Sequence, residues 1–426
     1  MQNLLQQLAA NRQGENKGIF SVCSAHPWVI EAALNHAKTH QLDVLIEATA
    51  NQVNQFGGYT AMQPADFIQF VKSMAKNLDC DEALIHFGGD HLGPVCWQHK
   101  PAEEAMMLAD SLIADYVRAG FKKIHLDTSM ACADDSLPLC ENEIAARAAR
   151  LCAIAEQTAR TEFGKSDIYY VIGTEVPPPG GADEVIDSLT VTAVSDVERT
   201  LQLHQKAFFA AGLAEAWQRV IGVVVQPGVE FDNWQVVQFD ASKAAALKTL
   251  VSPTHTWVYE AHSTDYQHTQ QLAQLVENHF AILKVGPELT FALREALFGL
   301  SHIEELLVAP LQQSHLRQVV ANDMATEPAS WQRFYHGTST AQAMQCYFSL
   351  SDRIRYFWTK PHVQAAVSKL IANINTLHIP KPLLRQYLPY AAELDIAKNN
   401  EGQGKRFATH YVERVIARYA SACGQL

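Results

Sequence analysis

The feature that most constrains the fold is a regular alternation of short apolar runs with segments long enough for a helix. Eight runs rich in β-branched residues follow one another, at residues 18–23, 44–48, 84–88, 123–127, 168–173, 221–225, 256–260 and 281–285. Near-continuous apolar runs bounded by turn residues are typical of parallel strands that are covered on both faces. Strands that alternate with helices indicate a parallel sheet.

Eight such units predict an α/β protein with a closed (β/α)8 barrel, the TIM barrel, which typically takes ~250 residues. We expect the barrel within residues 1–302, preceded by a short amphipathic helix over 1–13 that covers the barrel's bottom. An open doubly wound sheet is the alternative. No Gly-x-Gly-x-x-Gly turn follows the first run, which argues against the dinucleotide-binding version of that sheet.

Residues 303–426 lack the alternation of strands and helices. Their aromatic content is too high for a disordered tail. The aromatic residues noted here are Trp331, Phe334, Tyr335, Tyr347, Phe348, Tyr356, Phe357, Trp358, Tyr387 and Tyr390. We therefore expect a mainly helical, aromatic-rich extension that packs on the barrel or on a partner.

The charge balance limits the partners. The formal net charge is −12, from 45 acidic and 33 basic residues, which argues against a nucleic-acid surface and against an anionic membrane. The first residues show neither a basic start nor a long apolar stretch, so we expect no signal peptide, no membrane span and a cytoplasmic location. The 8 cysteines form no Cys-x-x-Cys pair, so a zinc ribbon is not predicted.

Polar residues gather where the predicted strands end. In a barrel all strands end on one face, and the active sites of such barrels lie there. The strand ends supply His26, Glu47, Asp90, His91, Asp127, Glu175, Gln226, Glu260, His262, Ser263 and Lys284. A chance collection of polar residues on the rim is the alternative.

His91 and His262, with Glu175 or Asp127 as an oxygen ligand, form a candidate site for zinc or another divalent metal. Asp90 is the candidate catalytic residue, because a carboxylate beside such an ion can give or take a proton. In the alternative reading, the histidines hydrogen-bond the barrel loops and Asp90 caps its own loop.

Candidate substrate-binding residues complete the predicted site. They are Glu47, Asn51, Gly57, Gly58, Asp127, Ser263, Lys284 and Gly286. The glycines could cradle a phosphate with backbone amides or could simply form turns. Lys284 could form a Schiff base or pair with a rim carboxylate. Gly164-Lys165-Ser166 lacks the upstream glycine of a P-loop, so we expect no nucleotide cofactor.

Long stretches of the chain resemble the Z subunit family of D-tagatose-1,6-bisphosphate aldolase (GatZ/KbaZ). The resemblance is carried by residues 47–59, 88–94, 172–177, 225–231, 260–267, 282–287 and 290–296. It implies a role in galactitol or N-acetylgalactosamine catabolism, in which tagatose bisphosphate is split into two triose phosphates. In that family the Y subunit is the metal-dependent class II aldolase. The Z subunit is needed for the activity and stability of Y and has no aldolase activity alone.

The Z family is in turn distantly similar to class II aldolases. These carry an Asp-His pair after the third strand, a Glu followed by Gly-Gly after the fifth and a metal-binding His after the seventh. Asp90-His91, Glu175 with Gly180-Gly181, and His262 match that pattern. After the sixth strand the class II enzymes have a metal-binding His, whereas this chain has Gln226.

Two hypotheses follow. Because Gln226 removes an expected ligand, the first is a non-catalytic subunit that binds and stabilises the catalytic Y subunit. The second is a metal-dependent sugar-phosphate aldolase, or a related sugar-phosphate enzyme, in its own right. Some members of the family carry the label of a tagatose-6-phosphate kinase, and nothing in these residues supports a kinase.

Overall fold

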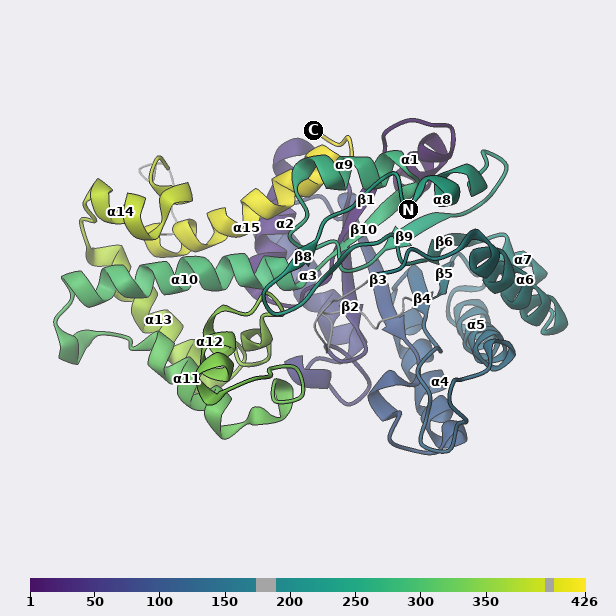
Figure 1. Ribbon diagram of the computed structural model, residues 1–426, viewed down its shortest axis with the longest axis horizontal. Coiled ribbons are helices and arrows are strands. Elements are labelled where there is room, and N and C mark those ends of the chain that lie inside the picture. The colour runs from purple at the N-terminus through teal and green to yellow at the C-terminus, as the bar shows by residue number, and fades with distance from the viewer. Residues whose placement is uncertain (174–188, 395–401) are drawn as a thin grey trace.

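The computed structural model describes residues 1–173, 189–394 and 402–426. Eight parallel strands close into a barrel in the order β1-β10-β9-β6-β5-β4-β3-β2 (Figure 1). These strands are β1 (Ile19–Val22), β2 (Val44–Thr49), β3 (Ile85–Leu92), β4 (Lys123–Leu126), β5 (Tyr169–Gly173), β6 (Val220–Val224), β9 (Val258–Ala261) and β10 (Phe280–Val285). The last strand pairs with the first, with Ile19 opposite Ile282. This closure confirms the predicted TIM barrel and excludes the open sheet.

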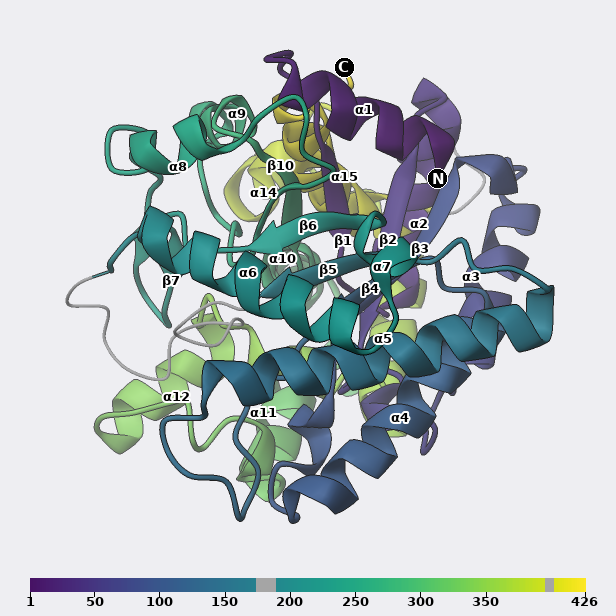
Figure 2. The same cartoon turned by 90° about the vertical axis from the view of Figure 1, so that its right-hand side faces the viewer.

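Helices surround the barrel, and Figure 2 shows α4, α5 and α6 along the outside of the strands. They are α2 (Pro27–His40), α3 (Pro64–Asn77), α4 (Ala102–Ala119), α5 (Glu141–Phe163), α6 (Val194–Ala210), α7 (Ala214–Trp217), α8 (Ala245–Leu250) and α9 (Thr269–Glu277). Local sequence sets their ends. Pro27 opens α2, where the His26 side chain accepts a hydrogen bond from the backbone N–H of Trp28. Gly120, with φ of 107°, ends α4.

A short antiparallel hairpin follows β6 and is built from β7 (Glu230–Phe231) and β8 (Val236–Val237). Single turns of 3-10 helix lie in several connections. They are η1 (Gly58–Thr60), η2 (Glu82–Leu84), η3 (Pro94–Trp97), η4 (Pro310–Gln312), η5 (Pro328–Ser330), η6 (Arg353–Tyr356) and η7 (Pro389–Ala391). Both η1 and η3 follow strand ends, so they shape the loops at the barrel mouth.

The bottom of the barrel is apolar. Helix α1 (Gln2–Arg12) buries Leu4 and Leu8 against side chains from the barrel strands. The strand residues in this second core are Ile19, Leu45, Ile221, Val258, Ala281 and Ile282. Burial of apolar side chains removes their surface from water and stabilises the closure. Helix α1 thus lies within the range 1–13 and covers the bottom of the barrel with Leu4 and Leu8.

The C-terminal segment is helical and begins with α10 (Pro287–Leu307), which runs from the barrel into the group of helices at the left of Figure 1. The others are α11 (Leu316–Thr326), α12 (Ser339–Phe348), α13 (Pro361–Thr376), α14 (Lys381–Tyr387) and α15 (Gln403–Ala422). Helix α10 continues without a break through position 302, where the sequence predicted the end of the barrel region. Helix α15 packs on α10, α2 and α9. The Tyr419 hydroxyl on α15 donates to the carbonyl of Thr264, at 2.7 Å.

Within the described residues, none of the helices combines the length and the apolar character that a membrane crossing requires.

Candidate metal centre at the barrel mouth

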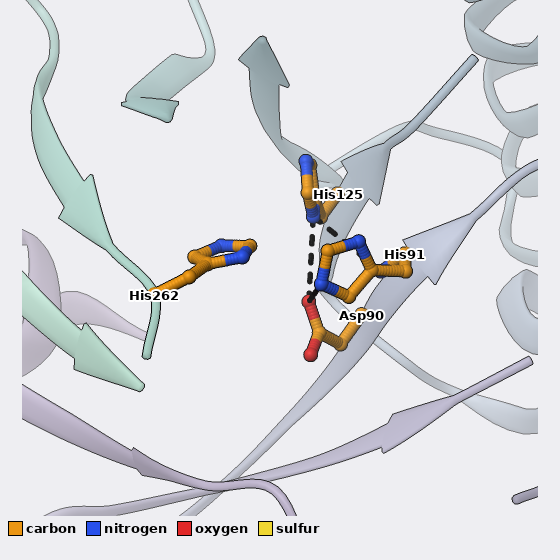
Figure 3. Close-up of side chains that lie close together, drawn as sticks. All are labelled: Asp90, His91, His125 and His262. Atoms are coloured by element: carbon orange, nitrogen blue, oxygen red, sulfur yellow. Dashed lines mark hydrogen bonds and ion pairs between the residues drawn. The ribbon is translucent and has the colours of Figure 1, made fainter. Parts of the chain in front are cut away.

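Four side chains from three strands converge at the carboxyl end of the barrel. They are Asp90 and His91 at the end of β3, His125 in β4 and His262 directly after β9. One ligand atom from each lies within 4.8 Å of the others, and Figure 3 shows the side chains turned toward one another. The ring centroids of His91 and His262 are 4.8 Å apart. The structure therefore brings together the two imidazoles that the sequence placed over one mouth.

Each imidazole in this cluster is oriented by an oxygen outside it. Nδ1 of His91 lies 2.8 Å from Oδ2 of Asp127. Nε2 of His125 lies 3.0 Å from the carbonyl oxygen of Gly173. Nε2 of His262 lies 3.0 Å from Oε1 of Glu260. Metal-binding histidines characteristically pair one ring nitrogen with a carboxylate or carbonyl in this way, which fixes the tautomer and leaves the other nitrogen for the ion.

Asp90 is the oxygen donor of the cluster. Its Oδ1 lies 3.3 Å from Nδ1 of His125, 2.7 Å from Nζ of Lys284 and 3.8 Å from Nε2 of His91. Burial raises the pKa of Asp90, but His91 and Lys284 outweigh burial and bring the pKa well below its usual value. The side chain is therefore a carboxylate at neutral pH, which is the form that binds a cation or accepts a proton.

The donor set fits a divalent metal ion. Three imidazoles and one carboxylate are ligands that zinc and related ions accept. Burial lowers the pKa of His262 to about 3, so this ring is neutral and keeps a nitrogen lone pair. His91 differs, because Asp90 and Asp127 overcome burial and raise its pKa. A metal ion would replace the proton that these two carboxylates favour on His91.

Beneath the cluster, two lysines and two glutamates form a buried ion-pair network. Nζ of Lys123 lies 2.6 Å from Oε1 of Glu47 and 2.7 Å from Oε2 of Glu260. Lys284 also pairs with Glu47 and reaches Asp90, so the network joins the metal cluster. Burial lowers the pKa of Lys284, but Asp90, Cys23 and Glu47 raise it well above its usual value. Lys284 is thus a charged partner of carboxylates, which favours pairing over the Schiff-base role.

Backbone conformation at the strand ends aims these side chains. His91 and Ser263 have φ of 48° and 49°, in the left-handed region that side chains other than glycine rarely adopt. Glycine is required at Gly88, where a Cβ would lie 2.3 Å from Oε1 of Glu47. It is also required at Gly93, where a Cβ would meet the carbonyl oxygen of Asp127 at 1.8 Å. The glycines around Asp90-His91 therefore make room for the charged core of the site.

The remaining predicted residues take varied positions. Asp127 supports His91 and also accepts from the Ser129 hydroxyl, at 2.7 Å. Ser263 is buried beside His262. Asn51 lies in the loop after β2, where its Oδ1 accepts from the Cys96 thiol, at 3.3 Å. Glu175 lies outside the described residues, so its predicted role as a ligand stays a prediction.

The backbone amides of the three candidate glycines already have acceptors. Gly57 donates to the carbonyl of Asn54 at 2.8 Å, and Gly58 donates to Oδ1 of Asn54 at 3.2 Å. Gly286 donates to Oδ1 of Asp265 at 3.0 Å. A phosphate held by these amides would have to displace those bonds, so the geometry favours the turn role that the sequence left open.

Sequence reasoning missed His125. Lys123 and His125 alternate along β4, and Asp127 follows it directly. Their contacts with Glu47, Asp90 and His91 place all three side chains inside the barrel. That alternation of polar residues inside an apolar run was the available signal. Gln226 does not join the cluster, because its Oε1 accepts from Gly228 and Val229 in its own loop, at 2.7 and 3.0 Å. The lack of a histidine at 226 therefore does not leave the centre short of an imidazole.

A family model described as D-tagatose-1,6-bisphosphate aldolase subunit GatZ/KbaZ-like matches residues 4–424, nearly the whole chain. This protein belongs to the GatZ/KbaZ-like family. A solved structure of a probable tagatose 6 phosphate kinase from Sinorhizobium meliloti 1021 is 45% identical, with a TM-score of 0.86. That alignment covers 96% of this chain and 100% of the other. This chain therefore shares its fold with that solved structure over nearly its whole length.

Two aldolase structures align more weakly with this GatZ/KbaZ-like chain. The fructose-bisphosphate aldolase from Campylobacter jejuni is 14% identical, with a TM-score of 0.43, over 88% of this chain and 95% of the other. The YdjI aldolase from Escherichia coli K12 is 11% identical, with a TM-score of 0.41, over 86% and 94%.

Proposed function

We propose that this GatZ/KbaZ-like protein is a metal-dependent enzyme that makes or breaks a carbon–carbon bond in a sugar phosphate. The observation that carries the proposal is the convergence of Asp90, His91, His125 and His262 at the barrel mouth. Three imidazoles, each held by an outer oxygen, are more than the hydrogen bonding of a loop requires. The description of the family as aldolase subunits supports a phosphorylated ketose as the substrate class.

His91, His125 and His262, with Asp90 beside them, would hold zinc or another divalent ion. When bound, such an ion supplies Lewis-acid polarisation of a substrate carbonyl. Asp90 is an ionised carboxylate beside the cluster, so its position allows it to accept the proton of a substrate hydroxyl. Loss of that proton allows the neighbouring carbon–carbon bond to break, and the electron pair of the bond passes toward the carbonyl.

Lys284 has a supporting role in this proposal. Its ammonium lies 2.7 Å from Asp90 and also pairs with Glu47, so it keeps a positive charge beside the proposed base. That charge stabilises the carboxylate before the proton transfer and turns Asp90 toward the cluster. The network thus couples the charge state of Asp90 to residues deep in the barrel.

The test uses the purified full chain with and without added zinc. We expect tagatose 1,6-bisphosphate or tagatose 6-phosphate to release a triose phosphate only in the presence of metal. Asp90→Asn is expected to retain the metal and lose turnover. The double variant His91→Ala, His262→Ala is expected to lose both the metal and turnover. A wild-type chain that binds metal and leaves both substrates unchanged would contradict the proposal.

A second candidate function is favoured by the family description, which names an aldolase subunit. In it, this chain binds a catalytic class II Y subunit in the cytoplasm and raises that subunit's activity and stability by mass action. Co-expression distinguishes the two functions. A supporting subunit would still prolong the half-life of the partner aldolase when it carries Asp90→Asn. If the partner's half-life and activity are the same with and without this chain, the supporting role fails.

A further inference from the structure

The C-terminal segment brings a group of cationic and aromatic side chains to the same end of the barrel as the metal centre. Helix η6 contributes Arg355 and Tyr356, and the Tyr356 ring meets that of Tyr59 at 4.8 Å in a T-shaped contact. Tyr59 lies in the loop after β2. The Trp358 ring lies 6.3 Å from that of His26, which follows β1. The segment around Arg355 is thus seated over the ends of β1 and β2.

Arg355 differs from three other arginines that are buried or half-buried. Arg147, Arg219 and Arg294 each bind a carboxylate, at 2.6, 2.8 and 2.7 Å. Half-buried Arg355 donates to the carbonyl of Ser351 at 3.0 Å and to the Tyr356 hydroxyl at 3.4 Å. No carboxylate in the described parts of the chain forms an ion pair with it. Because a guanidinium has five N–H donors, Arg355 retains donors for an anion.

Tyr356 adds a hydroxyl to this group. Its oxygen accepts from Nη1 of Arg353 at 3.3 Å and from Nη2 of Arg355 at 3.4 Å. Because the oxygen accepts in both bonds, the O–H group can itself donate to a ligand. Burial raises the pKa of Tyr356, but Arg355 and Arg353 outweigh it and lower the pKa to about 8. This concentration of positive charge is notable in a chain of net charge −12.

We propose that Arg355, with the hydroxyl of Tyr356, binds the phosphate group of a phosphorylated sugar. A planar guanidinium matches two phosphate oxygens, and charge-assisted hydrogen bonds to them are strong. The identity of the sugar rests on the proposed function, whereas the anion site rests on Arg355 and its neighbours alone. The C-terminal segment would then supply part of the substrate site, and the phosphate would lie on the β1–β2 side of the mouth.

The test is calorimetric titration of the full chain with three probes: inorganic phosphate, tagatose 6-phosphate and unphosphorylated tagatose. We expect Arg355→Met to weaken both phosphate probes by about tenfold or more and to leave unphosphorylated tagatose unchanged. Arg355→Lys should restore part of the affinity, because lysine keeps the positive charge. It should not restore all of it, because lysine lacks the paired N–H donors of the guanidinium. Arg414→Met is the matched control, since Arg414 also stacks on a tyrosine, Tyr390, at 3.3 Å, within the C-terminal segment.

A spectroscopic measurement adds a readout that a purely structural role would not move. Bound inorganic phosphate should raise the pKa of Tyr356, which would appear as loss of tyrosinate absorbance near pH 8 and would be absent in Tyr356→Phe. Equal phosphate affinity in wild type and Arg355→Met would overturn the proposal, as would the absence of saturable phosphate binding to wild type. Asp90→Asn should bind phosphate normally, so failure of the proposed catalysis is distinguishable from failure of this site.

Discussion

The two ends of the barrel are built from the same strands and follow opposite rules. At the bottom, Leu4 and Leu8 of α1 pack on Ile19, Leu45 and other apolar side chains. At the mouth, the same strands present carboxylates, lysines and histidines. Apolar burial stabilises the bottom directly. Burial of charge at the mouth costs free energy unless each charge is paired.

This difference indicates that selection for function has shaped the mouth of the barrel rather than its bottom. The bottom closes mainly with apolar layers, and the His86–Asp43 pair is a buried polar exception there. Glu47 and Glu260 are fully buried, and they are compensated by Lys123 and Lys284. An ion-pair network of this kind is weak evidence for stability. It is better explained by the need to hold Asp90 and His262 in fixed positions and charge states.

The largest effect is expected from Lys123→Met. The substitution leaves Glu47 and Glu260 buried with one cation fewer, and loss of one partner from a buried ion pair costs about 3–5 kcal/mol. Denaturant unfolding measures the change in the free energy of unfolding. Lys122→Met is the matched control, because the neighbouring Lys122 pairs at the surface with Asp167 and should cost less than about 1 kcal/mol. If the two variants lose similar free energies of unfolding, the buried ion-pair network is no more sensitive than a surface pair, and the contrast fails.

Leu8→Ala tests the apolar end and should have the next largest effect. Leu8 is 1% exposed, and truncating such a side chain costs about 2–3 kcal/mol through lost burial and the cavity left behind. Zinc affinity at the mouth should not change. Gln6→Ala, on the exposed face of α1, serves as the control. A loss of metal binding in Leu8→Ala would show that the two ends are coupled.

Glu230→Gln tests a single buried carboxyl, and its effect on stability should depend on pH. Burial raises the pKa of Glu230 to about 8, although its Oε1 accepts from the backbone N–H of Phe231 at 2.9 Å. Between about pH 4.5 and 8 the unfolded chain releases this proton while the folded chain keeps it, so wild-type stability falls as pH rises. Glutamine removes that loss. We expect the variant to be more stable than wild type at pH 8 and to differ little from it at pH 4.5, measured by thermal unfolding at both values.

The fold could be predicted because its signal is local and repeated. Apolar runs such as 44–48 and 281–285 correspond to β2 and β10 within one residue. Helices α4 and α5 end at Gly120 and Gly164, both in the left-handed region, where glycine is a local stop signal. The C-terminal segment was harder, since the seating of η6 over the loop of Tyr59 depends on contacts between distant parts of the chain. No local pattern encodes that contact.

The site could be predicted in part. Asp90, His91 and His262 could be identified from the sequence, because each is a polar residue at the end of an apolar run and close to turn residues. His125 stands inside a strand, and its role depends on the direction of its side chain and on the closure of the barrel. Gln226 had suggested a missing ligand because the comparison was made by strand position. In the barrel the third imidazole comes instead from His125 in β4, and only the three-dimensional arrangement shows this.

The most direct test of this account is zinc content and zinc affinity in three versions of the full chain. Wild type should bind one zinc ion, and His125→Ala should lose more than the roughly 10–100-fold in affinity that removal of an outer-shell partner costs. His86→Ala is the control, because His86 lies on β3 toward the bottom and pairs with Asp43 at 3.0 Å. It should bind zinc as wild type does. Equal zinc affinity in wild type and His125→Ala, or no zinc in either, would contradict the account.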